Sequence, residues 1–439
     1  MSRTDVPADG LPRLLPLVSG VPEDLRAHLA RYGRPPYRGG PGLLIHGVEA
    51  AGLTGRGGAA FPVHRKLAVV AAARGRKVIV ANGAESEPAS RKDDLLLRAA
   101  PNLVLDGLQL AAEAVGASEA HLCLHPGYHP ELLRALAERS AAGLDWLDVT
   151  LAEVPPRFLA GQESALVNRL GGGPALPAFV PPRVSERGLH GAPTLVQNVE
   201  TLAHVALIAR YGPQWFRMLG TDTEPGTMLT TVHQAPSGGS GGVKGSSAPI
   251  RQTERQVIEV AIGTPLSGLL ASQADAQAVL IGGFHGTWLP MSQAATLTLE
   301  NHALKRHGAA LGAGVIAALP ADRCGLAEAA RVTRYLAAES AGQCGPCLNG
   351  LSAIAGAMAE LASPRPRRRT RENVERWAGL VTGRGACNHP DGTVRFVRSA
   401  LTVFAQELSR HERGRCSATS RRPFLPLPDG IPTTEDDWI

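Results

Sequence analysis

Two cysteines in "ESAGQCGPCLNG", residues 339–350, have the type and spacing for metal or redox chemistry. Cys344 and Cys347 form a CxxC, and Cys387 follows after 39 intervening residues. The position that would complete a CxxCxxC holds Ala341, which cannot coordinate iron. Thiolates hold iron–sulfur clusters, whereas a bare CxxC acts as a redox dithiol when a neighbour lowers one thiol pKa. The motif is therefore compatible with a cluster site, a redox dithiol or the remnant of a cluster site.

A glycine-rich stretch, "GLTGRGGAAFP" at residues 52–62, surrounds Arg56 and is followed by Lys66. Glycine allows positive φ and close backbone approach, and cations beside it suit a phosphate or a flavin ring. The spacing differs from the dinucleotide pattern GxGxxG, so a structural turn is an equal alternative. The glycines concerned are Gly55, Gly57 and Gly58.

Polar residues follow the predicted strand "KVIVAN", which ends in Asn82 and leads into "ESEP" at residues 85–88. Open α/β sheets bind ligands beyond the carboxyl ends of their strands, although an acidic turn is the simpler alternative. Two later segments carry similar groups. "GQESALVNRLGG" puts Gly161 and Glu163 at a helix start, and "GAPTLVQNVETL" supplies Asn198 and Thr201.

The surrounding sequence predicts several domains, since 439 residues exceed one ordinary core and 44% are hydrophobic. Residues 41–225 alternate helix-like and strand-like patterns, which predicts an α/β domain. Short strand-like runs to about residue 300 enclose the Gly/Ser-rich "PSGGSGGVKGSSAP", expected to be a flexible loop. Residues 310–412 are nearly all helical in period. The tail is Pro-rich and expected to be extended or disordered without a partner.

Composition excludes several classes of protein. The net charge is +6, but arginine abundance alone gives little support to nucleic-acid binding. The basic stretch "RPRRRTR", residues 365–371, is either a solvated interhelical loop or a docking patch for an acidic electron carrier. Six cysteines form no disulfide framework, and Cys123, Cys324 and Cys416 receive no role. With no signal-peptide pattern or long apolar run, we expect a cytoplasmic protein that does not span a membrane.

The four polar segments, in this order and followed by the cysteines, resemble the NADH-binding flavoprotein subunit of respiratory complex I and its relatives in NAD-dependent hydrogenases and formate dehydrogenases. The resemblance covers roughly residues 40–410 and rests on "GRGGAAFP", "NGAESEP", Gln162-Glu163, "QNVET" and the cysteine spacing. It implies an α/β, small β-grasp and all-α architecture. The expected parts are an N-terminal segment (1–40), a Rossmann-like FMN domain (41–225), a ubiquitin-like SLBB domain (226–305), a helical iron–sulfur domain (306–412) and an extended tail (413–439).

The resemblance also implies a function and a set of site residues. Electrons would pass from NAD(P)H to FMN, then to a [4Fe-4S] cluster and a ferredoxin-like or thioredoxin-like iron–sulfur subunit of a hetero-oligomer. Glu87 and Glu163 are the implied catalytic residues, and Cys344, Cys347 and Cys387 the implied cluster ligands. The implied cofactor-binding residues are Gly55, Arg56, Gly57, Gly58, Lys66, Asn82, Glu85, Ser86, Gly161, Glu163, Val196, Asn198 and Thr201.

Departures from the family pattern limit what carries over. Besides Ala341, Ala84 and Gln162 replace two carboxylates. Positions that hold the NADH adenosine in the family fall on Val69, Val180 and Arg183, with Phe61 retained, so FMN binding is better supported than NADH binding. Three functions stay open: an electron-transfer flavoprotein, an FMN-binding scaffold without a working cluster, and a dithiol oxidoreductase.

Overall fold

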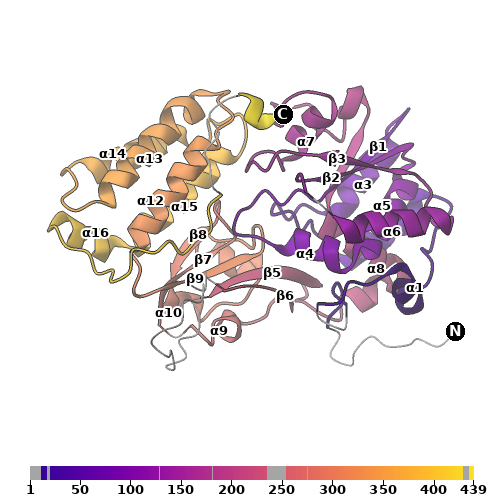
Figure 1. The fold of residues 1–439 in the computed structure, drawn as a ribbon, viewed down its shortest axis with the longest axis horizontal. Coiled ribbons are helices and arrows are strands. Elements are labelled where there is room, and N and C mark those ends of the chain that lie inside the picture. Colours follow the sequence, from indigo (N-terminus) through magenta and orange to yellow (C-terminus); the bar gives the residue numbers. More distant parts are fainter. Residues whose placement is uncertain are drawn as a thin grey trace. The chain divides into compact units, whose positions relative to one another are not determined.

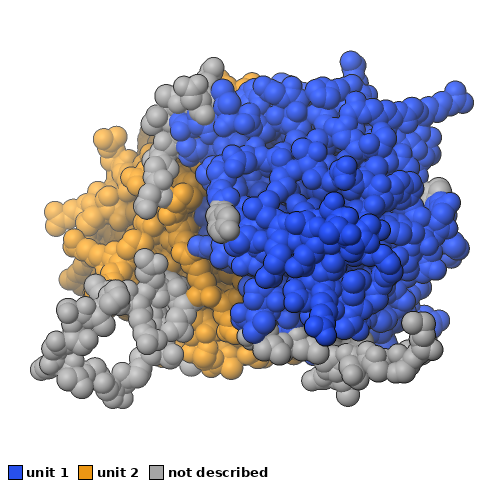
Figure 2. Space-filling view, turned by 45° about the vertical axis from the view of Figure 1, so that its right-hand side comes forward, with its two compact units in different colours: residues 1–229, 259–263, 432–439 blue, residues 230–258, 264–431 orange. Residues whose placement is uncertain are grey.

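The computed structural model describes residues 11–16, 20–127, 129–179, 181–234, 254–273, 275–428 and 435–439. The chain divides into two compact units, coloured separately in Figure 2. Unit 1 comprises residues 1–229, 259–263 and 432–439, and unit 2 comprises residues 230–258 and 264–431.

Unit 1 is built on a parallel four-stranded sheet, which confirms the predicted α/β character (Figure 1). Its strands are β1 (Val78–Asn82), β2 (Glu119–Leu124), β3 (Val149–Glu153) and β4 (Thr194–Asn198). They lie in the order β3-β2-β1-β4, and the register pairs Asn82 with Asn198. β1 is buried up to its last residue, as expected of a strand covered on both faces.

Helices cover both faces of this sheet. One face carries α5 and α8, which pack against each other and against β1, and Gly107 of α5 allows the close approach because a Cβ there would lie 1.9 Å from the Leu202 carbonyl oxygen. The other face buries Val80 and Val196 against Leu166 of α7. The helices of unit 1 are α1 (Leu25–Tyr32), α2 (Pro41–Ala51), α3 (Val63–Ala72), α4 (Lys92–Ala99), α5 (Pro101–Val115), α6 (Pro130–Ala141), α7 (Glu163–Leu170), α8 (Val199–Phe216), and the 3-10 turns η1 (Leu189–Gly191) and η3 (Glu435–Trp438).

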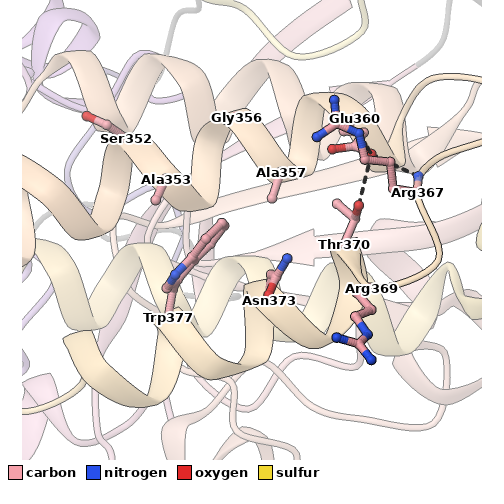
Figure 3. A pocket seen from close by; sticks show the side chains of 10 residues that line it. All are labelled: Ser352, Ala353, Gly356, Ala357, Glu360, Arg367, Arg369, Thr370, Asn373 and Trp377. Atoms are coloured by element: carbon pink, nitrogen blue, oxygen red, sulfur yellow. Dashed lines mark hydrogen bonds and ion pairs between the residues drawn. The ribbon is translucent and has the colours of Figure 1, made fainter.

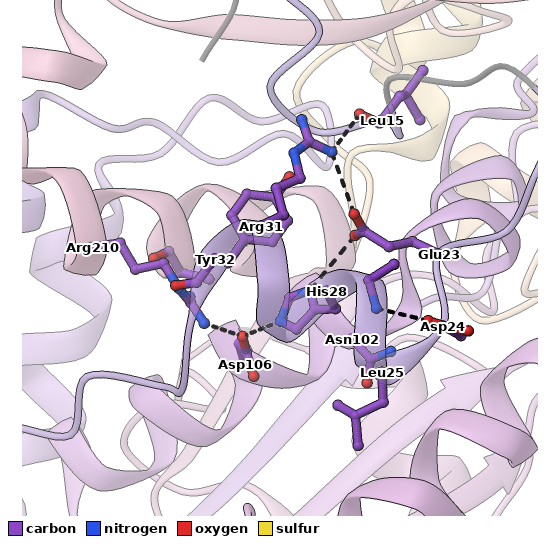
Figure 4. A network of polar contacts seen from close by, with 12 residues as sticks. Leu15, Glu23, Asp24, Leu25, His28, Arg31, Tyr32, Asn102, Asp106 and Arg210 are labelled. Carbon is purple, nitrogen blue, oxygen red and sulfur yellow. Dashed lines mark hydrogen bonds and ion pairs between the residues drawn. The ribbon is translucent and has the colours of Figure 1, made fainter. Parts of the chain in front are cut away.

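A buried polar network fastens α1 to the sheet-covering helices (Figure 4). His28 Nε2 lies 2.7 Å from Asp106 Oδ2, and Arg139 and Arg210 contact the same carboxylate. Burial alone would raise the pKa of Asp106, but the His28 hydrogen bond and the two arginines hold it well below its usual range. Helix α1 of the N-terminal segment is thereby attached to the rest of unit 1.

The second sheet is mixed and five-stranded, in the order β6-β5-β9-β7-β8. β5 pairs parallel with β9, while β7 pairs antiparallel with both β8 and β9. Its elements are β5 (Thr227–Gln234), β6 (Glu254–Ala261), α9 (Leu266–Leu269), β7 (Ala276–Ile281), β8 (Thr287–Pro290), α10 (Met291–Ala294), α11 (Asn301–Lys305) and β9 (Val315–Pro320). The predicted Gly/Ser-rich loop lies outside the described residues.

Strand β9 corrects the expectation that the chain turns helical near residue 310. "VIAALP" is a short apolar run, for which periodicity cannot separate a buried strand from a helix. Its place in the sheet, between β5 and β7, explains why all but its last residue are buried. After residue 310 the first helix, α12, begins at Gly325.

The remainder of unit 2 is helical, as predicted. It contains α12 (Gly325–Ala338), the π-helical turn η2 (Pro346–Leu351), α13 (Ser352–Leu361), α14 (Thr370–Val381), α15 (His389–Val403) and α16 (Ala405–Glu412). Across the described residues of the chain, no helix is both long and apolar enough to cross a membrane.

The segment after α16 lacks helix and strand up to residue 428, yet it is held firmly within unit 2. Phe424 and Leu425 are buried, and their backbone N–H groups donate to the Glu328 carboxylate of α12 at 3.1 Å each. The buried Trp438 accepts a hydrogen bond from Ala175 N–H within unit 1. The described parts of the tail therefore find partners inside the chain, so of the two alternatives, extended or disordered, the disordered one does not hold for them.

Candidate functional site

The predicted cofactor residues gather where the sheet order changes direction. From β1 the chain builds β2 and β3 on one side, and β4 lies on the other, so the carboxyl ends of β1 and β4 form a topological switch point. Asn82 and Asn198 end these two strands side by side. Asn82 Nδ2 donates to the Gly161 carbonyl at 2.9 Å, which draws the loop before α7 to the same edge.

Ser86 and Gly161 form the tightest part of this edge. The Ser86 hydroxyl is buried and finds no hydrogen-bond partner among the described residues. A Cβ on Gly161 would lie 2.5 Å from Ser86 Oγ, so only glycine fits there. A buried hydroxyl without a partner costs free energy unless something satisfies it. Ser86 and Gly161 are therefore suited to a polar ligand that hydrogen-bonds to the Ser86 hydroxyl and passes close to the backbone of Gly161, which has no side chain in the way.

The glycine-rich loop is a closed turn around Arg56. Gly55 N–H donates to the Phe61 carbonyl at 2.9 Å, and Gly58 has φ of 103°, where a side chain would be strained. Gly57 lies against Asn198, because a Cβ on Gly57 would lie 3.3 Å from the Cβ of Asn198. The Gly-rich loop and the end of β4 are thus in contact.

Arg56 itself is placed differently from the prediction that it offers a cation to a cofactor phosphate. Its guanidinium is buried and donates to the Thr54 hydroxyl at 2.9 Å and to the Thr227 carbonyl at 3.2 Å. Its backbone N–H donates to Thr201 Oγ1 at 2.8 Å. The side chain therefore joins the loop to the first residue of β5, and Thr201 supports the loop rather than facing a cavity.

Lys66 and Glu163 form an ion pair between α3 and the start of α7. Burial, with the positive charge of Arg183, lowers the pKa of Lys66 to about 8. The Lys66 Nζ also lies 5.9 Å from the centre of the Phe61 ring. The other implied catalytic carboxylate, Glu87, accepts a hydrogen bond from Ala89 N–H at 3.2 Å.

Two of the predicted residues act mainly in the framework. Glu85 accepts from the N–H groups of Asp93 and Asp94, so it caps α4, and burial together with Asp93 raises its pKa to about 7. Val196 is 3% exposed and packs in the apolar cluster of the sheet. The Val196 side chain therefore has a packing role, and cofactor binding by this residue stays a prediction.

A buried charge cluster beneath the site was missed from the sequence. Lys92 Nζ lies 2.7 Å from Asp93 Oδ1 and 2.9 Å from Glu200 Oε2, and all three side chains are buried. Asn198 bridges them, since its Nδ2 donates to Asp93 at 2.7 Å. The signal was present as charged residues in "RKDD" and "NVET", but nothing local shows that they meet across 105 or more residues.

The positions expected to hold nicotinamide adenosine are mostly open. Val69 is 48% exposed on α3, Arg183 is exposed near Lys66, and Val180 lies outside the described residues. Phe179, which the sequence analysis overlooked, is 64% exposed and follows Ala178, whose N–H donates to the Ser164 hydroxyl of α7. An exposed aromatic ring thus stands beside the α7 end of the site.

The three cysteines of the predicted cluster site come together around η2. Burial raises the pKa of the Cys347 thiol to about 11. The neighbouring Cys344 and Cys387 raise it further, while a hydrogen bond with Ser340 acts in the opposite direction. A redox dithiol needs the opposite shift, so this environment opposes that hypothesis. Three thiols can serve three irons of a cluster, and Ala341 leaves the fourth position without a side-chain donor.

His389 and Asp391, which follow Cys387 and are the nearest candidates in sequence for a fourth ligand, are both engaged in other contacts. His389 is buried, its Nε2 donates to the Leu336 carbonyl at 2.8 Å, and its Nδ1 lies 3.0 Å from His285 Nε2. Burial lowers the pKa of His389 to about 4, which keeps the ring neutral. Asp391 Oδ1 accepts from Gly383 N–H at 2.7 Å. Both side chains would have to give up these contacts to act as ligands.

The basic stretch borders a hollow between α13 and α14 (Figure 3). Glu360 accepts from Arg367 N–H at 2.8 Å and from Thr370 Oγ1 at 2.9 Å, which closes one end of the hollow. Arg367 and Arg369 line it, and Trp377 stands toward the other end. The arginines of residues 365–371 are exposed and make few internal ion pairs among the described residues.

The parallel sheet with polar strand ends is thus accompanied by a helical region in which three cysteines lie close together. Residues 48–207 match the Nuo51 FMN-binding domain, and residues 327–411 match the NADH-ubiquinone oxidoreductase-F iron-sulfur binding region. The chain is thus similar, in two separate regions, to FMN-binding and iron–sulfur-binding domains of NADH-quinone oxidoreductase subunits.

Individual relatives support this assignment over most of the chain. An NADH-quinone oxidoreductase subunit of Rhizobium meliloti is 28% identical, with 86% of this chain and 90% of the relative covered. The corresponding subunit of Streptomyces coelicolor is 29% identical, covering 85% and 84% respectively. The crystal structure of an NAD+-reducing [NiFe]-hydrogenase in the air-oxidized state superposes with a TM-score of 0.73 at 28% identity, covering 90% of this chain. This chain spans only 65% of that hydrogenase chain.

Proposed function

We propose that the protein is an FMN-dependent electron-transfer subunit that moves electrons from NAD(P)H or another donor to an iron–sulfur centre. The observation that carries the proposal is the buried Ser86 hydroxyl without a partner among the described residues, facing the bare backbone of Gly161 at the switch point. That arrangement suits the polar edge of a flat heterocycle. Bound FMN would supply the conversion of electron pairs into single electrons, which the amino acids here cannot perform.

The site residues take distinct tasks in this proposal. Gly55, Gly57 and Gly58 leave room for the ring, and Asn82, Asn198 and Glu85 hold the strand-end loops in place. Lys66 supplies the cation for the phosphate, and Glu163, its partner, stands at the side where a donor approaches. Arg56 and Thr201 brace the glycine-rich loop.

The remaining parts of the architecture have proposed roles as well. Cys344, Cys347 and Cys387 hold an iron–sulfur cluster with one non-cysteine position. The second sheet, with its parallel β5–β9 pair, is a ubiquitin-like SLBB domain of β-grasp type. The exposed arginines of residues 365–371 receive an acidic ferredoxin-like or thioredoxin-like iron–sulfur subunit within a hetero-oligomer.

Use of NADH is proposed to be weak. Val69 and Arg183 replace groups that would grip the adenosine, and loss of one aromatic stacking contact costs about 0.5–1.5 kcal/mol. Arg183, exposed and close enough to affect Lys66, instead suits the 2'-phosphate of NADPH. Phe179 offers one aromatic surface nearby.

A second function, an FMN-binding scaffold without a working cluster, is favoured by Ala341 and by the engagement of His389. Anaerobic purification with flavin, iron and sulfide quantitation, EPR, and stopped-flow reduction by NADH and NADPH separates the two. Electron transfer predicts one FMN, three to four irons and a flavin that bleaches with a nicotinamide donor. Flavin without iron supports the scaffold, and protein that neither contains nor binds FMN contradicts both.

A further inference from the structure

A second group of metal-binding side chains lies in unit 2, apart in sequence from Cys344, Cys347 and Cys387. It consists of Cys324, Glu407, His411 and Cys416, and one ligand atom from each lies within 4.8 Å of all the others. Cys324 caps α12, Glu407 and His411 stand one turn apart on α16, and Cys416 belongs to the segment that follows. Three separate elements thus converge on one point.

The distances fit tetrahedral coordination without rearrangement. His411 Nε2 lies 3.6 Å from Cys324 Sγ and 3.3 Å from Glu407 Oε1. A tetrahedral Zn²⁺ with bonds of about 2.3 Å to sulfur and about 2.0 Å to nitrogen or oxygen separates such ligand pairs by about 3.6 and about 3.3 Å. These two distances therefore match those around a tetrahedral zinc ion, and all four ligand atoms lie within 4.8 Å of one another.

Surrounding hydrogen bonds orient the ligands as a metal site requires. His411 Nδ1 donates to the Leu361 carbonyl at 2.9 Å, so the lone pair of Nε2 points to the cysteines. Glu407 accepts from Ser417 Oγ at 2.6 Å and from Arg410 at 2.9 Å, which fixes the carboxylate. Cys324, Glu407 and His411 are buried, while Cys416 is exposed and leaves an entry path.

The same segment is already held beside Cys324 by other contacts. Thr419 and Ser420 donate their N–H groups to the Asp322 carbonyl at 3.1 and 3.0 Å, and the Arg323 guanidinium donates to Ser420 Oγ at 2.6 Å. A bound ion at Cys416 would therefore complete an existing attachment between this segment and the start of α12.

We propose that Cys324, Glu407, His411 and Cys416 form a structural Zn²⁺ site that fastens the segment after α16 to the start of α12. Two thiolates, an imidazole and a carboxylate suit zinc and disfavour Ca²⁺ or Mg²⁺. Four protein ligands leave no open position, so the ion is structural rather than catalytic. Binding releases the two thiol protons to solvent and involves no change of oxidation state.

The test is elemental analysis of the full chain purified with zinc in the medium, with zinc and iron counted separately. We expect about one zinc per chain, and a zinc-edge X-ray absorption spectrum fitted by two sulfur and two nitrogen or oxygen ligands. Cys416→Ser, at an exposed position, and His411→Gln should retain less than a tenth of the zinc. Cys123→Ser, a buried thiol of β2, should retain all of it.

Limited proteolysis gives a readout that does not depend on metal counting. Chelation and Cys416→Ser should both speed cleavage within residues 413–428 at least several-fold, and added ZnCl2 should reverse only the effect of chelation. The proposal is overturned if reduced protein takes up no zinc from ZnCl2, if Cys416→Ser keeps its zinc, or if the native chain carries a Cys324–Cys416 disulfide.

Discussion

The missing side chain of Gly161 is as important to the candidate site as any group that is present. Gly161→Ala would place a methyl group 2.5 Å from Ser86 Oγ, where it fills the space left for a ligand. We expect FMN affinity to fall at least tenfold, with little change in the melting temperature of the flavin-free protein because Ser86 lies on a loop. Fluorescence titration with FMN measures the affinity.

The matched control is Gly171→Ala at the other end of α7, where a Cβ meets nothing closer than 3.4 Å. It should bind FMN as the native protein does. Equal binding by both variants would show that FMN does not occupy the Ser86–Gly161 edge.

Lys66 gives the site a pH dependence with a definite sign. Its pKa of about 8 means that the ammonium is charged below pH 8 and loses its charge above it. The phosphate of FMN stays dianionic in this range, so the dissociation constant for FMN should rise by up to about tenfold between pH 7 and 9. Lys66→Gln should bind weakly with a flat profile, while Lys77→Gln should keep the native profile. A sloping profile in Lys66→Gln would assign the titration to another group.

At this scale the sequence identified the residues better than their tasks. Asn82 and Ser86 were predicted at a strand end and Gly161 at a helix start, and the register brings Asn82 beside Asn198. Arg56 was given the wrong task because spacing cannot show where a long side chain points. The Lys92–Asp93–Glu200 cluster was not predicted, since its partners meet only in the folded sheet.

At the scale of elements, Arg56 connects the glycine-rich loop to strand β5. Arg56→Ala removes hydrogen bonds to Thr54 and Thr227 and leaves buried carbonyl oxygens unsatisfied. We expect the free energy of unfolding to fall by about 3 kcal/mol in the absence of FMN. Chemical denaturation of flavin-free protein measures this, with the exposed Arg65→Ala as control. If Arg56→Ala loses FMN binding but keeps the native free energy of unfolding, the result would instead support a direct contact between Arg56 and the FMN phosphate.

Turn η2 and the loops before η2 and α15 carry the three thiols and Ala341, so in the proposed cluster site a single change would supply a fourth thiol. Ala341→Cys should raise the iron content to four per chain, slow the loss of the cluster in air and lower its reduction potential, because a thiolate donates more charge than a non-thiolate ligand. Iron assay, EPR and redox titration check this, with Ala362→Cys as control. Iron-free anaerobic protein in both native and Ala341→Cys forms would make the site a remnant.

Element types followed the sequence wherever the periodicity was long, as in α5 and α13. They failed at β9, where a six-residue apolar run fits either type of element. For the tail, the sequence left an extended and a disordered segment as alternatives, because the residues that hold it are distant in sequence. The Glu328 carboxylate accepts hydrogen bonds from two backbone N–H groups of the tail, and proline content alone cannot reveal such a partner.

At the scale of the whole molecule, each compact unit carries one half of the proposed function. Unit 1 holds the strand-end site, and unit 2 holds the three predicted cluster cysteines together with the exposed arginines of residues 365–371. The chain covers most of the length of its NADH-quinone oxidoreductase relatives but about two thirds of the hydrogenase chain. In the proposed function electrons leave the cluster for a docking partner, and charge is the property by which unit 2 would attract one.

Replacing Arg368 and Arg369 with glutamate should slow electron delivery to an acidic ferredoxin about tenfold at low ionic strength, because both side chains are exposed and neither donates a described hydrogen bond. The difference should vanish near 1 M salt, where the screening length is about 3 Å. Stopped-flow mixing of dithionite-reduced protein with oxidised ferredoxin gives the rate without depending on NADH. The control carries Arg26→Glu and Arg334→Glu, which make the same change of charge at exposed positions elsewhere. If electron delivery slows equally in both double variants, the effect comes from net charge, and residues 365–371 are not the docking site.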